Sequence, residues 1–179
     1  MKKIRIDDLS FKVFISRNEI SKKIIKLRKE VIARHQNCFP ICLIVLNGAK
    51  SFAREFLQSL EPSPEIHFIN VKSYVGTSST GKVLVKSLPN RKLKNKKVLL
   101  IEDIVDTGNT LSFLKTELIK NGAKQVECVT LLFKPMKYNY DSLPEYIGFN
   151  IGPEFVVGFG MDLNQKGRDL EDIYKNVNC

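Results

Sequence analysis

Hydrophobic and polar positions along the 179 residues follow two different periods. Short uninterrupted apolar runs, such as ICLIVL, are typical of strands that are buried on both faces. Other stretches place apolar residues three or four positions apart, as on one face of a helix. The runs predict strands at 11–15, 41–46, 65–72, 83–88, 98–102 and 126–133. The helical spacing predicts helices at about 16–35, 49–60 and 111–121.

The order of these elements predicts an α/β fold. Residues 98–133 contain a strand, a loop, a helix and a second strand, which together make a βαβ unit. Because such crossovers join parallel strands, we expect a twisted, mainly parallel sheet flanked by helices. The pattern becomes irregular after residue 135, apart from an apolar stretch at 155–161. No repeat or linker interrupts the chain, so we expect residues 1–179 to form a single domain.

Two helix ends carry local signals. Ser16 and Glu19 have the spacing of a capping box, which predicts the start of the first helix. Gly122 suits the position just after the end of the third helix, where a left-handed residue is common.

The net charge of +10 is unevenly distributed. Residues 1–35 carry 11 basic and 4 acidic side chains, and residues 86–97 carry 6 basic and no acidic ones. The rest of the chain is slightly acidic. A basic balance of this size is compatible with a nucleic-acid partner, with phosphate-bearing small molecules or with a solvated surface.

Membrane and secretory classes are excluded by the length of the apolar runs. No run approaches the roughly 18–20 residues of a membrane helix. Lys12 interrupts the apolar stretch at 9–15, so the N-terminus lacks a signal-peptide core. The four cysteines show no CxxC spacing. We therefore expect no membrane partner, free thiols and a cytoplasmic location.

Acidic and hydroxyl side chains follow the apolar run at 98–102. Ligands of an open α/β sheet bind beyond the carboxyl ends of its strands, where this chain places Glu102, Asp103 and then DTGNT at 106–110. The following helix N-terminus suits a phosphate, and Gly108 allows close approach of the backbone. Two carboxylates beside such a cradle suit ribose hydroxyls or Mg²⁺. For the DTG triplet alone, an ordinary βα turn with capping hydroxyls is the alternative.

The complete string VLLIEDIVDTGNTL resembles the 5-phosphoribosyl-1-pyrophosphate (PRPP) motif of the phosphoribosyltransferases. Further matches narrow the resemblance to the hypoxanthine-guanine phosphoribosyltransferases. LNGA at 46–49 is similar to their pyrophosphate loop, and SYVGTSSTGKV at 73–83 is similar to their mobile loop. LLFKP at 131–135 matches their purine-side lysine segment, and FVVGFGMDLNQKGRDL at 155–170 is similar to their C-terminal purine and pyrophosphate segment. These matches occur in the family's order.

The resemblance implies the type I phosphoribosyltransferase fold, with a small hood formed by the terminal segments. It implies transfer of the 5-phosphoribosyl group of PRPP to hypoxanthine, guanine or both, which gives IMP or GMP and pyrophosphate. Mg²⁺ is the implied cofactor, because it spreads the charge of the leaving pyrophosphate. The family also implies a homodimer or a homotetramer.

The resemblance further assigns roles to individual residues. Asp106 is the expected catalytic base near N7 of the purine. Lys134 would select a 6-oxo group, since its ammonium only donates hydrogen bonds, and the alternative is a strand-end lysine in solvent. Phe155 would stack on the purine. Arg168 would bind pyrophosphate, and the alternative for this residue is an ion pair with Asp169 or Glu171. Implied for PRPP and ribose phosphate are Glu102, Asp103, Asp106, Thr107, Gly108, Asn109 and Thr110. The residues implied to bind pyrophosphate are Leu46, Asn47, Gly48 and Arg168, and those implied to bind the purine are Lys134, Phe155, Val156 and Asp162. The residues implied to bind the metal are Glu102, Asp103 and Asp162. The mobile loop is implied to contribute Ser73 and Tyr74.

Two residues depart from the commonest patterns of the family. Asn47 stands where some members carry Lys or Arg, and Asn109 stands where Lys is frequent. Both departures remove a positive charge near phosphate groups. The resemblance also implies a non-proline cis peptide bond between Leu46 and Asn47.

Two alternative functions are compatible with the sequence. One is a regulator with the phosphoribosyltransferase fold that senses PRPP and binds RNA through its basic face. The purine residues argue against it, because a sensor needs no base-selective pocket, and we do not expect a nucleic-acid partner. The other is an enzyme that prefers xanthine, since backbone carbonyls can select the group at position 2 of the purine.

Overall fold

The computed structural model describes residues 3–36, 38–58, 60–73, 83–85 and 93–177. No helix within these ranges is long and apolar enough to cross a membrane. The elements in chain order are β1 (Lys3–Ile6), β2 (Leu9–Ile15), α1 (Arg17–His35), β3 (Ile41–Leu46), α2 (Lys50–Leu57), β4 (Ile66–Ser73), β5 (Val83–Val85), β6 (Lys97–Val105), α4 (Asn109–Lys120), β7 (Gln125–Phe133), β8 (Tyr146–Asn150), β9 (Val156–Val157) and β10 (Ile173–Asn176).

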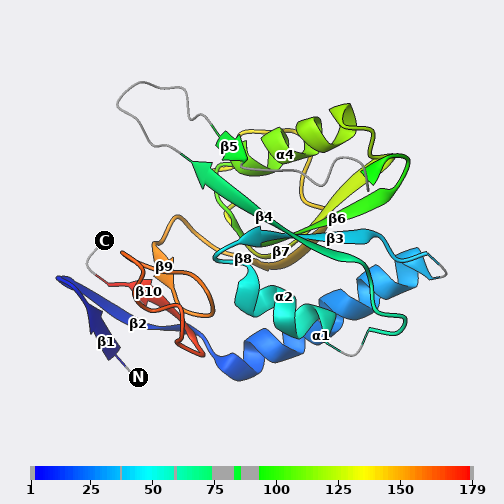
Figure 1. Cartoon of the computed structure of the whole chain (residues 1–179). Helices are drawn as coiled ribbons and strands as arrows, with labels where there is room; N and C mark the ends of the chain where they lie inside the picture. Colours follow the sequence, from blue (N-terminus) through cyan, green and yellow to red (C-terminus); the bar gives the residue numbers. More distant parts are fainter. Residues whose placement is uncertain (1–2, 37, 59, 74–82, 86–92, 178–179) are drawn as a thin grey trace.

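The larger of two sheets has the strand order β5-β4-β3-β6-β7-β8. Strands β4, β3, β6, β7 and β8 are parallel, and β5 is antiparallel at the edge. Helices α1 and α2 cover one face of this sheet, and α4 covers the other (Figure 1). The expected α/β fold, with a mainly parallel sheet flanked by helices, is confirmed.

Helix α1 begins and packs as its sequence predicts. The Ser16 side chain accepts a hydrogen bond from the Glu19 backbone, and the Glu19 carboxylate accepts one from the Ser16 backbone. The apolar positions of α1 are buried between the helix and the sheet, since they share one helical face. Gly122 follows the end of α4 with φ +91°, as expected for a left-handed residue at that place.

The structure corrects the sequence prediction at short or half-buried strands. Strand β6 extends from Lys97 to Val105, three residues beyond the predicted end at 102, so Asp103 lies within the strand instead of after it. Strands β1, β8 and β10 were not predicted, because they are four or five residues long and mix polar with apolar positions. Only Val83–Val85 of the strand expected at 83–88 is described as β5, and the remaining residues lie outside the described ranges.

The two ends of the chain meet in the smaller sheet, which has the order β1-β2-β10-β9. All of its strand pairs are antiparallel, and Val13 of β2 lies opposite Tyr174 of β10. Phe11, Val157 and Tyr174 form a small buried core on this sheet. The sheet lies beside the carboxyl ends of the larger sheet (Figure 1), so the expected hood of terminal segments is confirmed.

The direction in which successive strands are added to the larger sheet changes between the neighbouring parallel strands β3 and β6. From β3 the chain passes through α2 to β4 on one side, and from β6 it passes through α4 to β7 on the other. Such a reversal leaves a crevice beyond the carboxyl ends of the two central strands. In this chain, Asn47 and Gly48 follow β3, and Asp106 follows β6 at the same edge.

Candidate active site at the carboxyl ends of the central strands

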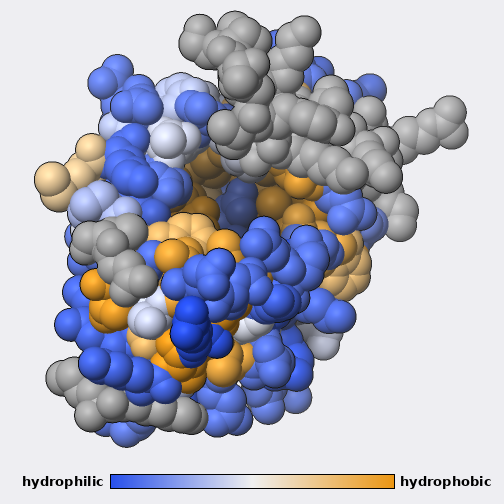
Figure 2. Space-filling view, turned by 90° about the vertical axis from the view of Figure 1, so that its left-hand side faces the viewer, coloured by the Kyte–Doolittle hydropathy of each residue, from blue (hydrophilic) through white to orange (hydrophobic). Residues whose placement is uncertain are grey.

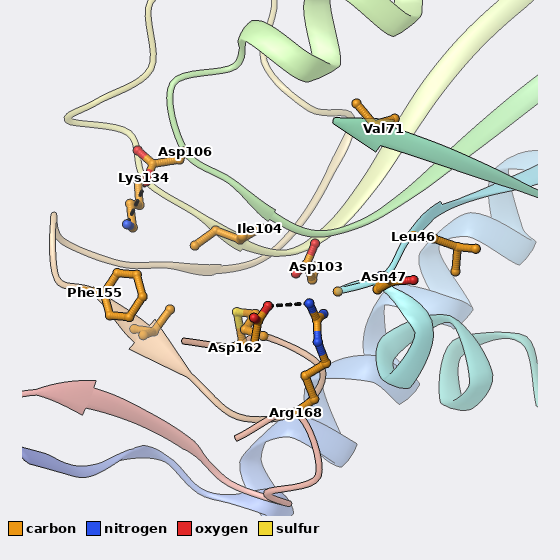
Figure 3. A pocket seen from close by; sticks show the side chains of 13 residues that line it. Leu46, Asn47, Val71, Asp103, Ile104, Asp106, Lys134, Phe155, Asp162 and Arg168 are labelled. Atoms are coloured by element: carbon orange, nitrogen blue, oxygen red, sulfur yellow. Dashed lines mark hydrogen bonds and ion pairs between the residues drawn. The ribbon is translucent and has the colours of Figure 1, made fainter. Parts of the chain in front are cut away.

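A cavity of about 570 Å³ lies between the carboxyl ends of the larger sheet and the hood. Figure 2 looks at this edge and shows a hollow with a hydrophilic side chain between hydrophobic neighbours. Figure 3 shows the side chains that line the cavity, which come from β3, β4 and β6, the loops after β3, β6 and β7, and the hood. Ten of the expected site residues line it: Leu46, Asn47, Gly48, Asp103, Asp106, Lys134, Phe155, Val156, Asp162 and Arg168.

The loop after β3 packs directly against the acidic residues of β6. The Leu46–Asn47 peptide bond is cis, as the resemblance implied. A Cβ atom at Gly48 would overlap the carboxylate of Asp103, so a larger residue at this position would have to displace that carboxylate. Gly160 of the hood, with φ +104°, in turn lies against the backbone carbonyl of Gly48. Close contact between these backbones brings the expected pyrophosphate loop to the carboxylates.

Glu102 and Asp103 are adjacent carboxylates with strongly altered proton affinities. Burial, followed by the charge of Asp103, raises the pKa of Glu102 well above its usual range. Burial raises the pKa of Asp103 to about 6, although two backbone N–H groups and the charge of Arg168 oppose the shift. Among the described residues, Glu102 Oε1 is buried and has no hydrogen-bond partner. These groups therefore carry an electrostatic cost that a bound cation or hydroxyl donor would relieve.

Lys134 is buried at the wall of the cavity, which rules out the alternative of a strand-end lysine in solvent. Its side chain is 5% exposed, and Nζ lies 2.8 Å from Asp106 Oδ2. The Lys134 backbone N–H donates to the carbonyl of Val105, so the ends of β6 and β7 hold the two charged residues together. Lys137 Nζ is 3.9 Å from the other carboxylate oxygen of Asp106. Phe155 lies opposite Lys134 across the cavity (Figure 3).

Arg168 pairs with Asp162 within the hood. One guanidinium nitrogen lies 2.6 Å from Asp162 Oδ1, and another donates to the carbonyl of Gly160 at 3.0 Å. The expected alternative partners, Asp169 and Glu171, make no ion pair with Arg168 in the described part of the chain. Figure 3 shows the guanidinium end of Arg168 lying between Asp162 and Asp103. The expected pyrophosphate ligand, Arg168, and the expected metal ligands, Asp103 and Asp162, therefore lie in the same region of the cavity.

The loop between β6 and α4 has the features of a phosphate cradle. Gly108 has φ +86° and is the N-cap of α4, where it has no side chain to make a capping hydrogen bond. Helix α4 begins at Asn109, two residues earlier than predicted. The Asn109 N–H donates to Thr107 Oγ1 at 3.5 Å, and the N–H groups that follow it in this first turn make no capping bond to a side chain of the described loop and are available to an anion. Thr107 and Thr110 lie in the same segment and are half-buried.

The other expected residues divide between described and undescribed parts of the chain. Ser73 is the last residue of β4, while Tyr74 and the rest of the expected mobile loop to residue 82 lie outside the described ranges. Val71, Ile104 and Met161 also line the cavity and were not predicted. Their only sequence signal is that they are apolar residues beside a polar motif. This pattern is as typical of core residues as of residues that line a site.

Metal binding by protein groups alone finds no support in the described ranges. There, no cluster of three or more His, Cys, Asp or Glu residues is arranged to hold an ion. Mg²⁺ often binds through one or two carboxylates together with substrate phosphates and water. The adjacent Glu102 and Asp103, with an unpartnered oxygen, fit this second arrangement.

The model of the phosphoribosyl transferase domain matches residues 16–164. The chain belongs to the phosphoribosyltransferase family. The hypoxanthine-guanine phosphoribosyltransferase of Bacillus subtilis (strain 168) is 36% identical over 160 residues, which cover 89% of each chain. The bifunctional protein TilS/HprT of Listeria innocua is 40% identical over 161 residues. These residues are 89% of this chain and 25% of that protein, so the chain spans about a quarter of that relative's length.

Solved structures agree with the family. A hypoxanthine-guanine phosphoribosyltransferase from Bacillus anthracis, with HEPES in its active site, superposes with a TM-score of 0.85 and 31% sequence identity. The superposition covers 93% of this chain and 96% of that chain. The expected type I phosphoribosyltransferase fold is thereby confirmed.

Proposed function

We propose that this phosphoribosyltransferase transfers the 5-phosphoribosyl group of PRPP to hypoxanthine or guanine, forming IMP or GMP and releasing pyrophosphate. The observation that carries the proposal is the buried ammonium of Lys134 beside Asp106 in the cavity. An ammonium donates hydrogen bonds and accepts none, so a base bound there needs an acceptor such as a 6-oxo group. Adenine would place an amino group at this point and leave the buried charge unpaired.

Phe155 and Asp106 complete the proposed base site. The Phe155 ring is 41% exposed and faces the cavity, where a purine can stack on it. Val156, the next residue, also lines the cavity, and its backbone is proposed to bond the edge of the base. When a 6-oxo group takes the hydrogen bond of Lys134, Asp106 loses that partner and becomes the base for the proton at N7.

The loop at 106–110 is the proposed site of the 5′-phosphate, and Glu102 and Asp103 are proposed to hold the ribose hydroxyls. Positive charge develops at C1′ of the ribose as the bond to pyrophosphate breaks. The carboxylates of Asp103 and Asp106 line the cavity and stabilise that charge. Arg168 and the backbone of residues 46–48 are proposed to bind the departing pyrophosphate, with Ser73 and Tyr74 closing the site against water.

Mg²⁺ is the proposed cofactor. Glu102 and Asp103 would hold it together with PRPP, and Asp162 would be available for a second ion. When bound, the ion spreads the negative charge of the leaving pyrophosphate. The support is the donor set itself: two adjacent buried carboxylates with raised pKa values, one of which has an unpartnered oxygen within the described ranges.

The decisive experiment is a spectrophotometric assay with PRPP, Mg²⁺ and each of hypoxanthine, guanine, xanthine and adenine. We expect nucleotide from hypoxanthine or guanine and none from adenine. The Asp106→Asn variant should lose about 100-fold or more in kcat, as is usual when an acid–base group is removed. Product from xanthine alone would identify the alternative enzyme. No product from any base, together with salt-dependent RNA binding, would identify the regulator.

A homodimer or homotetramer is the proposed assembly. A second groove of about 760 Å³ lies between α2 and β4, and its apolar part includes Leu57, Ile66 and Phe68. Phe68 is 58% exposed, which is unusual for a large apolar side chain on a strand. This surface is the strongest candidate for a subunit contact, and sedimentation equilibrium measures the mass of the assembly directly.

A single domain and a cytoplasmic location are further proposals. Ile15, Val156 and Ile173 of the hood are buried in the same core as residues of α1, α2 and β6, which supports folding as one unit. Cys38, Cys42 and Cys128 are free thiols, which supports a reducing compartment.

A further inference from the structure

The segment that follows Lys134 folds back over the phosphate loop. The Asn139 backbone N–H donates to the carbonyl of Thr107 at 3.1 Å. A Cβ atom at Gly108 would overlap the rings of Tyr138 and Tyr140, so both rings pack directly against this glycine. The loop that is proposed to hold the 5′-phosphate is therefore covered by a neighbouring segment with two aromatic rings.

The two rings are themselves fixed by further contacts. The Tyr138 ring meets Phe133, the last residue of β7, edge-on with 5.0 Å between ring centroids. The centroids of Tyr138 and Tyr140 are 5.8 Å apart. Tyr138 also donates its hydroxyl hydrogen to the carbonyl of Ser142 at 2.5 Å. Tyr140 is thus held in place from the sheet through Tyr138.

The Tyr140 hydroxyl makes a contact of its own with the phosphate loop. It donates a hydrogen bond to Oδ1 of Asn109 at 3.0 Å. A side-chain amide has one oxygen acceptor and two N–H donors on the opposite atom. Because the oxygen is held by Tyr140, Nδ2 lies on the opposite arm of the planar amide, and within the part of the chain that the structure describes it makes no hydrogen bond of its own. Asn109 is the first residue of α4, where anions bind.

We propose that Tyr140 is a positioning residue for phosphate binding, a role that rests on the proposed function. Tyr140 orients the amide of Asn109 so that Nδ2 donates to the 5′-phosphate of the ribose. Asn109 is neutral and stands where a lysine is frequent in the family. A neutral donor gains nothing from long-range attraction and acts only when its geometry is right. Tyr140 supplies this geometry, since it fixes which end of the amide faces the anion.

The test removes one hydroxyl group and leaves the ring in place. Tyr140→Phe keeps the packing against Gly108 and deletes the hydrogen bond to Asn109. We expect KM for PRPP to rise about 3- to 10-fold, the effect of one hydrogen bond, while kcat and KM for hypoxanthine stay the same. The matched control is Tyr138→Phe, whose hydroxyl is bonded to Ser142 and not to the phosphate loop; its KM for PRPP should stay within about twofold of the wild type.

A double-mutant cycle separates positioning from general loosening of the segment. In an Asn109→Ala background the Tyr140→Phe change should have no further effect on KM for PRPP, because the amide that Tyr140 orients is absent. An equal rise in that background, an unchanged KM for Tyr140→Phe, or the same rise for Tyr138→Phe would each overturn the inference.

Failure of the proposed function gives a different result. In that case the wild type makes no nucleotide from any base. Binding of ribose 5-phosphate, measured by calorimetry, then decides the inference: weaker binding by Tyr140→Phe than by Tyr138→Phe supports it, and equal binding overturns it.

Discussion

Two buried glutamates, Glu102 and Glu127, lie toward different ends of the same pair of strands and have opposite environments. Glu102 on β6 pairs in register with Thr130, and Glu127 on β7 pairs with Leu99, three positions nearer the start of each strand. Both glutamates are almost completely buried. Within the described ranges, Glu102 has an oxygen with no partner, whereas both oxygens of Glu127 are bonded.

The partners of Glu127 come from three different elements. Arg34 and His35 at the end of α1 contact its two oxygens at 3.1 and 2.8 Å. The hydroxyl of Tyr146, the first residue of β8, donates to it at 3.2 Å, and Gln125 donates at 2.8 Å. A buried charge with this many donors is stable without a ligand. Glu127 therefore joins α1 to the sheet.

In the described part of the chain Glu102 lacks such compensation, and Asp103 has only part of it, from two backbone N–H groups and the charge of Arg168. Burial outweighs these contacts and raises the pKa of both groups, and this difference separates a structural charge from a functional one. The cost of burying them is met only when hydroxyl groups or a cation bind beside them. The comparison predicts that removing the carboxylate of Glu127 will destabilise the fold, whereas removing that of Glu102 will change stability little or increase it.

The largest expected effect distinguishes the two glutamates directly. Glu127→Gln should lower the free energy of unfolding by about 3–5 kcal/mol, because it breaks a buried network and leaves its donors unmatched. Glu102→Gln, the matched variant, should change it by less than about 1 kcal/mol or raise it, while PRPP turnover falls. Urea unfolding of both variants checks this. Equal destabilisation by the two substitutions would contradict the distinction.

A second effect depends on pH. Burial raises the pKa of Asp103 to about 6 from 3.8, so between these values the folded state binds a proton that the unfolded state has lost. Stability from this group is therefore lost as pH rises from about 4 to 6. The free energy of unfolding of the Asp103→Asn variant should therefore rise relative to that of the wild type over the same range, and the difference should reach up to about 3 kcal/mol above pH 6.

Unfolding midpoints of wild type and Asp103→Asn, measured in urea from pH 4.5 to pH 8, test the sign of this effect. Their difference should widen with pH and then level off. A difference that is constant, or that narrows as pH rises, would show that the folded protein holds Asp103 as an ordinary paired carboxylate.

The larger sheet was predictable from sequence because its central strands are buried on both faces. Strand β3 has the predicted bounds, and the capping box at Ser16 marks the start of α1. The hood strands β1 and β10 were missed, since strands of four residues that mix polar and apolar side chains are too short to show a distinctive period. Local pattern carries no information about such non-local pairing.

Most of the candidate site was predictable as a set of residues but not as a set of contacts. The PRPP motif, the pyrophosphate loop, the lysine segment and the C-terminal segment together identified ten residues that line one cavity. The pair Lys134–Asp106 could not be predicted, because it depends on how the ends of two strands approach one another, and the pair Arg168–Asp162 depends on a turn without a regular pattern. The contact of Tyr140 with Asn109 spans 31 residues and has no sequence signal either.

The smallest effect tests how Glu127 is satisfied. Burial, followed by the charge of Glu127, raises the pKa of Tyr146 to about 12, so its hydroxyl keeps its proton at any ordinary pH. Tyr146→Phe should lower the free energy of unfolding by about 1–2 kcal/mol, since a buried carboxylate loses one donor and keeps three. The loss should be the same at pH 7 and pH 9, because the hydroxyl does not ionise in that interval. Tyr138→Phe, which removes an exposed hydroxyl, should change stability by less than about 0.5 kcal/mol and controls for the loss of a tyrosine oxygen. If both variants are equally stable, the Tyr146 bond adds nothing, and the charged and imidazole partners alone make Glu127 a structural group.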